Sequence, residues 1–200
     1  EPLDAMAMVG LLDRKGQLRL ATRTADNGDT DILRVDGDQF TKIYSCSVFE
    51  SCGPVRFHKD NARVYMVTNK GTADLLSLIL LDPVSGKEEL VETDPQKRVD
   101  FGNASFSEVT DELLATAYED ERTRVYFRDK AYEADYRLVE KKLPGKDLNI
   151  PSATSDERLL LISASSDREP GQRYLFDRKT KALTLQYSAF EKLPRQHLAP

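Results

Sequence analysis

Short stretches of β-branched, aromatic and leucine residues alternate with polar turns along the chain, a pattern typical of half-buried β-strands. Four of these stretches are followed directly by an aspartate. The stretches span residues 32–35, 78–81, 125–128 and 173–176. The aspartates are Asp36, Asp82, Asp129 and Asp177, at intervals of 46, 47 and 48 residues. This near-constant interval predicts a structural repeat that runs through the chain.

Each repeat reads as a strand, a polar turn, two further β-rich strands and, after the aspartate, a turn and a final strand. A period of roughly 40–50 residues with four strands per unit is typical of β-propeller blades, whereas the strands of a β-sandwich would not recur so regularly. We therefore predict an all-β fold, a partial β-propeller of about four four-stranded blades. The blades are expected at about residues 5–49, 50–98, 99–147 and 148–187, which gives a propeller region of 1–187 and a linker at 188–200.

The repeated aspartates are predicted to accept hydrogen bonds from the backbone amides of the turns that follow them. Turn-forming residues follow three of the four, at 37–38, 83–87 and 178–181. Catalysis is the other role open to a carboxylate, but four equivalent copies favour the structural role.

Residues 105–118 are the one segment whose local sequence opposes the repeat. Ser105 and Glu108 have the spacing of a helix capping box, and residues 112–115 favour a helix. The three counterparts of this segment are strongly β, and helix propensity is a weak determinant beside tertiary context. The repeat therefore predicts strands here.

Composition and charge exclude several function classes. The net charge is −5, and 29 Lys and Arg residues are scattered over the 200 residues, whereas a nucleic-acid site needs a concentrated basic face. The longest apolar run, residues 78–81, is far too short to span a membrane. We expect neither nucleic acid nor membrane as a partner. The chain does not begin with Met, so we expect it to be excised from a longer one, and the compartment of a bacterial parent stays open between cytoplasm and periplasm.

The candidate metal ligands and thiols give little reason to expect a cofactor. Cys46 and Cys52 lie six residues apart. They could form a small-loop disulfide in an exported protein or remain a pair of free thiols, and both alternatives stay open. Two cysteines with His58 and His197 do not supply four ligands at workable spacing. We predict no metal site and no cofactor.

A cluster of oxygen ligands between residues 26 and 31 resembles a Ca²⁺ loop at first sight. It contains Asp26, Asn27, Asp29 and Asp31. The spacing does not match an EF-hand, and the bidentate glutamate is missing. The Asn-Gly pair at 27–28 favours a hairpin turn instead.

The last eight residues, Leu-Pro-Arg-Gln-His-Leu-Ala-Pro at 193–200, follow the blades without β alternation. Blades followed by this segment resemble the end of the propeller in the prolyl oligopeptidase family of serine peptidases, closest to its acylaminoacyl-peptidase and dipeptidyl-aminopeptidase-like branch. The resemblance implies that an α/β-hydrolase domain of the parent chain comes next. It also implies that the propeller caps the active site of that domain and filters its peptide substrates.

The same family resemblance makes the absence of catalytic residues informative. The family's nucleophile sits in Gly-x-Ser-x-Gly, and that motif does not occur here. A triad also needs a histidine beside the serine, and we predict that His58 and His197 are solvated surface residues. We therefore predict no catalytic, cofactor-binding or metal-binding residues in this chain.

Two other functions remain as alternatives. A stand-alone propeller could serve as a protein-interaction module, although the chain has no Trp and thus no Trp-Asp signature of a WD40 repeat. A carbohydrate-active propeller would need a carboxylate pair in its central channel, which nothing in the sequence indicates. Four blades would be about half of the family's usual ring of seven or eight. We therefore expect the open arc either to associate with a second copy or to close imperfectly.

Overall fold

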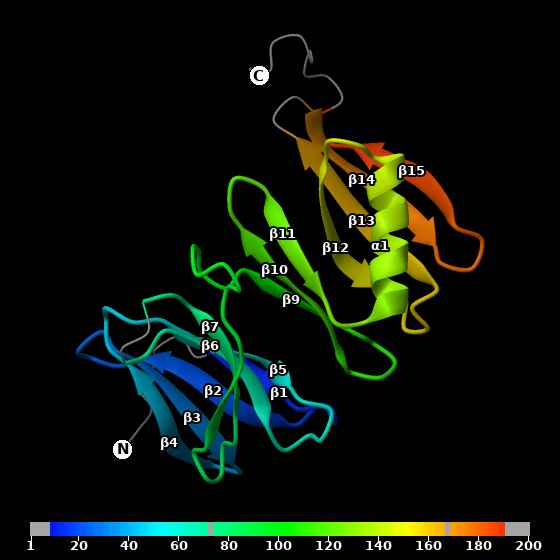
Figure 1. Ribbon diagram of the computed structural model, residues 1–200. Helices are drawn as coiled ribbons and strands as arrows, with labels where there is room; N and C mark the ends of the chain where they lie inside the picture. Colours follow the sequence, from blue (N-terminus) through cyan, green and yellow to red (C-terminus); the bar gives the residue numbers. More distant parts are fainter. Residues whose placement is uncertain (1–8, 72–73, 167–168, 191–200) are drawn as a thin grey trace. The chain divides into compact units, whose positions relative to one another are not determined.

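The computed structural model describes residues 9–71, 74–166 and 169–190 (Figure 1). The chain divides into two compact units, Glu1–Phe101 and Gly102–Pro200. The strands of the first unit are β1 (Val9–Leu12), β2 (Leu18–Thr24), β3 (Thr30–Asp36), β4 (Gln39–Cys46), β5 (Cys52–Phe57), β6 (Val64–Thr68), β7 (Ser77–Leu81) and β8 (Glu88–Glu92). The elements of the second unit are β9 (Asn103–Phe106), β10 (Leu113–Glu119), β11 (Thr123–Phe127), α1 (Lys130–Lys142), β12 (Asp147–Ala153), β13 (Leu159–Ser166), β14 (Glu169–Asp177) and β15 (Ala182–Ser188).

Each unit contains two antiparallel sheets whose strands follow one another in sequence order. The first unit has the sheets β1-β2-β3-β4 and β5-β6-β7-β8, and the second has β9-β10-β11 and β12-β13-β14-β15. Four successive meanders of this kind are propeller blades, so the predicted all-β fold and partial propeller are confirmed.

The core of the first unit lies between its two sheets. Alternate residues of neighbouring strands share a face, so Val64 and Met66 of β6 point to the same side as Ile79 and Leu81 of β7. They pack against the buried face of the first sheet. The buried members of this cluster are Leu20, Ile32, Tyr44, Cys46, Phe57, Val64, Met66, Ile79 and Leu81. Neither sheet could bury this apolar face without the other.

The final strand predicted for the third blade is wrong, because helix α1 occupies that place in the sequence. Asp129, the repeated aspartate of this blade, has extended backbone, and its carboxylate accepts a hydrogen bond from the Tyr132 amide at 2.7 Å. It is thus the N-cap of a helix instead of the start of a hairpin turn. No turn-forming residue follows it, and Tyr132, Tyr136 and Val139 repeat at helical spacing and are buried.

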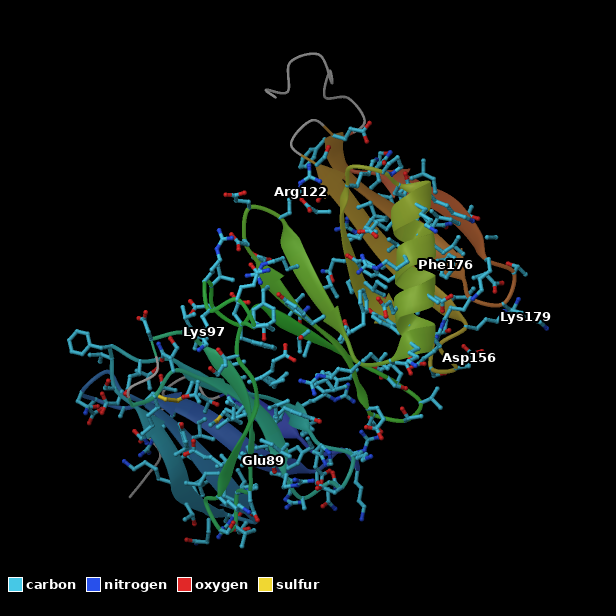
Figure 2. The ribbon with its side chains drawn as sticks, in the orientation of Figure 1. Glu89, Lys97, Arg122, Asp156, Phe176 and Lys179 are labelled. Atoms are coloured by element: carbon cyan, nitrogen blue, oxygen red, sulfur yellow. A yellow bond between two sulfur atoms is a disulfide. The ribbon has the colours of Figure 1, made fainter. Side chains whose placement is uncertain are left out.

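The apolar face of α1 packs onto the fourth sheet. Tyr136, Val139 and Leu143 contact a cluster that includes Leu160 and Phe176. Figure 2 shows Phe176 beside α1, and its side chain is fully buried. The helix therefore contributes buried apolar side chains to the core of the second unit.

Replacing the N-cap tests the role of Asp129 in this departure from the repeat. We expect Asp129→Ala to lower the unfolding free energy of the second unit by about 1 kcal/mol, the usual cost of losing an N-cap side chain. The hydrogen-exchange rate of the amides in the first turn of α1 should rise as this stability is lost. Asp129→Asn keeps an acceptor oxygen and should cost less than half as much, so equal losses in both variants would contradict the capping role.

The segment whose local sequence favours a helix is β, as the repeat predicts. β9 and β10 pair across a turn at 107–112. The capping-box pair Ser105 and Glu108 does not start a helix, since Ser107 takes over the turn: its hydroxyl accepts from the Val109 and Thr110 amides at 3.2 and 2.9 Å.

The predicted turn role of the repeated aspartates is confirmed at Asp82 and Asp177. Each carboxylate accepts from the two amides that begin its turn, at 2.8 and 3.2 Å in both cases. The Arg158 side chain and these amides lower the pKa of Asp177 to about 2. Asp36 differs, since it forms an ion pair at 2.7 Å with Arg34 of its own strand.

The hairpins between the first two strands of the blades share a second repeated feature, which aligning the four repeats in the sequence does not reveal. In each of them one residue has a left-handed backbone conformation: Gly16, Asn61, Asp111 and Glu157. In the second blade of each unit, the side chain of that residue reaches the hairpin of the preceding blade. Asn61 accepts from the Arg14 amide at 2.9 Å, and Glu157 accepts from the Glu108 amide. These bonds span 47 and 49 residues, close to one repeat, and tie neighbouring blades together.

In the first unit, the hydrogen bonds of the Asn61 side chain extend to the buried carboxylate of Asp13. Asn61 also donates to Asp13 at 3.1 Å, and Asp13 accepts from the Lys15 and Gln17 amides and from Arg19. Burial acts to raise the pKa of Asp13, but these hydrogen bonds outweigh it and lower the pKa from about 3.8 to about 2.

Two substitutions separate the conformation of Asn61 from its hydrogen bonds. Asn61→Gly keeps the left-handed backbone and should cost about 1 kcal/mol for the lost bonds. Asn61→Ala adds the penalty of an alanine in that conformation, so we expect a total of about 2 kcal/mol. Urea unfolding of both variants measures the two terms, and equal destabilisation by Ala and Gly would contradict the conformational part.

Acid should weaken the first unit through Asp13. Its pKa is lower in the folded chain than its ordinary value, so its stabilising effect is complete above about pH 4 and is lost as the pH falls toward about 2. Urea midpoints measured at several pH values for the wild type and Asp13→Asn should therefore converge between about pH 4 and pH 2. A gap between them that stays constant with pH would contradict this account.

Candidate functional site

A polar pocket of about 280 Å³ lies between the third and fourth sheets, within the second unit. It is lined by Gly102, Asn103, Ala117, Glu119, Thr123, Asp147, Leu148, Asn149, Ser163 and Ser165. These residues provide amides, hydroxyls and two carboxylates, and none of them is a histidine, a cysteine, a lysine or an arginine.

The antiparallel pairing brings the polar lining to one end of both sheets. Asn103 begins β9 and lies opposite Ala117, while Asp147 begins β12 and lies opposite Ser165. Glu119 ends β10. No sequence motif could reveal the pocket, because its residues come from five strands and only the pairing register brings them together.

Lys146, which precedes the lining residue Asp147, already has partners of its own. Lys146 contacts the carboxylate of Glu169 and the side-chain oxygen of Gln172. Tyr174 donates to the same Gln172 oxygen at 2.8 Å, and Ser188 accepts from the Gln172 amide. The charge of Lys146 is therefore balanced by Glu169, and the pocket lining itself carries only negative charge.

The lining can bind polar groups, but it has no arrangement for nucleophilic catalysis. Ser163 and Ser165 would need a histidine within hydrogen-bond reach to act as nucleophiles, and no histidine lines the pocket.

His58 lies in a blade turn, as predicted, but the expectation that it is a solvated surface residue is wrong. Its side chain is only 12% exposed, because it lies against the ring of Tyr65 and its Nδ1 is 2.9 Å from an Asp60 carboxylate oxygen. Asp60 also accepts from the Ala62 and Arg63 amides, so the group stabilises the turn. His197 lies outside the described residues, as does the segment 193–200.

The oxygen cluster at 26–31 forms a hairpin turn, as the Asn-Gly pair predicts. Gly28 has φ 86° and donates to the Ala25 carbonyl oxygen. Asp31 is buried in β3, where its carboxylate accepts from the Arg23 side chain at 3.2 Å and from the Ser45 hydroxyl at 2.9 Å. Among the described residues no group of three or more His, Cys, Asp or Glu side chains could hold a metal ion.

The structure decides between the two alternatives for the cysteines. Cys46, the last residue of β4, and Cys52, the first of β5, form a disulfide with a Cα–Cα distance of 6.1 Å. The bond closes the connection between the first two blades.

Comparison with known proteins finds the same fold in several solved structures. The sequence matches no family model, and no curated protein matches it. Among solved structures, the chain is similar to prolyl endopeptidase, with a TM-score of 0.58, 15% identity and 92% of the chain covered. It is also similar to a puromycin-hydrolyzing peptidase of Mycobacterium tuberculosis, with a TM-score of 0.54, 11% identity and 96% covered. For puromycin hydrolase the values are 0.52, 13% and 91%.

The chain has the propeller fold of these proteins. It covers 26%, 30% and 29% of their respective lengths, so it corresponds to well under half of each. Within the described residues, no helix is long and apolar enough to cross a membrane.

Proposed function

We propose that this chain is a non-catalytic propeller region of a serine peptidase of the prolyl oligopeptidase family. The observation that carries the proposal is the likeness over 91–96% of the chain to three solved structures of peptidases or puromycin hydrolases. The exit segment at 193–200, which resembles the family's entry into its hydrolase domain, supports the same assignment. The missing Gly-x-Ser-x-Gly motif agrees with a non-catalytic role.

In this role the blades cap the active site of an α/β-hydrolase domain in the parent chain and select substrates by size. A propeller can exclude folded proteins only if its blades do not move apart. The hydrogen bonds from the Asn61 and Glu157 side chains to the preceding blade, and the disulfide between the first two blades, resist such movement. Short peptides pass, and the polar pocket of the second unit offers them amide and carboxylate partners.

Peptide reporters of graded size test the filter. The parent protein should cleave a short coumarin-linked peptide and leave the same sequence intact when it is inserted into a folded carrier domain. After the carrier is unfolded, the site should become cleavable. Equal cleavage of the site in the folded and unfolded carrier would overturn the filtering role.

The purified 200-residue chain tests the non-catalytic role separately. We expect no hydrolysis of aminoacyl-, acylaminoacyl- or prolyl-coumarin reporters above the rate in buffer. Turnover that copurifies with the chain and disappears in a Ser163→Ala or Ser165→Ala variant would contradict the proposal, because these are the serines of the polar pocket.

A further inference from the structure

Residues 47–51 form a closed loop between the first two blades, and the loop exposes two adjacent apolar side chains. The disulfide of Cys46 and Cys52 joins its two ends. Val48 is 54% exposed and Phe49 is 92% exposed. A single exposed apolar residue needs no explanation, but this pair stands on a covalently closed loop.

Hydrogen bonds fix the loop from within and from the neighbouring turn. The Glu50 carboxylate accepts from the Ser47 amide at 2.9 Å, from the Ser47 hydroxyl at 3.1 Å and from the Gly71 amide at 2.9 Å. Ser51 donates its amide to the Asn69 side chain at 2.7 Å, and the Asn69 amide donates to the Ser51 carbonyl oxygen. The Gly71 and Ser47 amides lower the pKa of Glu50, so these bonds hold over the neutral pH range.

Val48 also packs against the β2–β3 hairpin. A Cβ atom on Gly28 would lie 2.7 Å from a methyl carbon of Val48, so a larger residue at position 28 would have to displace the Val48 side chain. The loop is thus supported on one side by the hairpin and on the other by the turn at 69–71. The polar side chains of Ser47 and Glu50 form hydrogen bonds within the loop and to Gly71. The apolar side chains of Val48 and Phe49 are therefore the main groups that the tip exposes.

A phenyl ring exposed to water lacks the favourable free energy that burial against an apolar partner would supply. Aromatic side chains are enriched at protein interfaces, and one carried on a loop whose backbone is already fixed loses little backbone entropy when it binds. The partner surface must offer an apolar pocket that admits a phenyl ring and needs no charged group.

The small area of the tip decides what kind of partner it fits. A single phenylalanine side chain buries roughly 150–250 Å², and one neighbouring valine adds less than that, whereas a stable complex between separate proteins buries about 1,200–2,000 Å². An anchor this small is effective when partner and tip belong to one chain, because the effective concentration is then high. The peptidases that the chain matches are more than three times the length of the matched region, so a chain of that kind has such a domain.

We propose that the tip formed by Val48 and Phe49 docks into an apolar pocket on the hydrolase domain of the parent chain. The proposal rests on the proposed function and adds a named contact to it. Docking at this point would fix the hydrolase domain to the connection between two blades, where the disulfide resists displacement.

Site-specific photo-cross-linking in the full-length parent tests the contact. A benzophenone amino acid placed at position 49 should cross-link on irradiation to peptides of the hydrolase domain. The matched control position is 84, where Val84 is 76% exposed in the β7–β8 turn, and it should give at least tenfold less of that product. Cross-links from position 49 only within residues 1–200, only to a second copy, or to nothing would overturn the proposal.

A second measurement keeps this test separate from the proposed function. A parent chain that lacks a hydrolase domain would overturn the proposed function itself. If the domain is present and active, amides 47–51 should exchange at least tenfold more slowly in the parent than in the 200-residue chain. Equal exchange would overturn the docking contact alone.

Discussion

Arg178→Met should lower the unfolding free energy of the second unit by about 3 kcal/mol, because it leaves a buried carboxylate poorly compensated. Asp135 lies on α1 with only 5% of its side chain exposed, and Arg178 from the turn after β14 bonds it at 2.8 Å. Lys181 lies 2.5 Å from the other Asp135 oxygen but is half exposed. Arg178 also pairs with Glu157 at 3.2 Å, so the variant loses two ion pairs. The turns after β12 and β14 lie at the same end of the fourth sheet, as Asp156 and Lys179 show in Figure 2.

Arg137→Met is the matched control on the exposed face of the same helix. Arg137 pairs with Glu133 and Glu140, and all three side chains are nearly half exposed. Exposed pairs contribute about 0–1 kcal/mol, so this change should cost less than 1 kcal/mol. Hydrogen exchange of β13 and β14 peptides measures both variants within the unit concerned. Similar losses in the two would show that the Asp135 cluster has no special weight.

Removal of the disulfide should lower the unfolding free energy of the first unit by about 2–3 kcal/mol. In the chain-entropy treatment, a bond that closes a loop of this length restricts the unfolded chain by about that amount. The variant Cys46→Ala with Cys52→Ala is the direct test. Urea unfolding of the wild type with and without dithiothreitol gives a second measurement that needs no substitution.

The disulfide prediction has an internal control in the second unit. That unit contains no cysteine, so dithiothreitol should leave its hydrogen exchange unchanged while β4 and β5 of the first unit lose protection. An unchanged first unit, with two free thiols titrated after reduction, would contradict the stabilising role.

The regular part of the fold could be predicted from the sequence because one residue marks each blade. An aspartate that begins a turn fixes where the third strand ends, and at Asp82 and Asp177 its hydrogen bonds are the ones that turn chemistry requires. The same marker misleads at Asp129, because an aspartate caps a helix as readily as it begins a turn. The buried spacing of Tyr132, Tyr136 and Val139, read without the repeat, would have indicated the helix.

The contacts between blades could not be predicted in the same way. Asn61 reaches Arg14 across 47 residues, and its left-handed backbone gives no signal in the sequence, since asparagine is common in turns of every kind. The polar pocket depends on the pairing register of five strands, and its serines and asparagines resemble ordinary surface residues in the sequence. For the cysteines, six-residue spacing fits a disulfide and free thiols equally well, and only the positions of β4 and β5 decide between them.

Labelling the full-length parent with a fluorophosphonate probe, followed by mapping of the labelled residue, tests the central claim most directly. If this chain is the non-catalytic propeller of a serine peptidase, one serine beyond residue 200 reacts, it lies in a Gly-x-Ser-x-Gly sequence, and no serine within 1–200 carries the probe. A labelled serine within 1–200, or a parent that does not react at all, would contradict the claim.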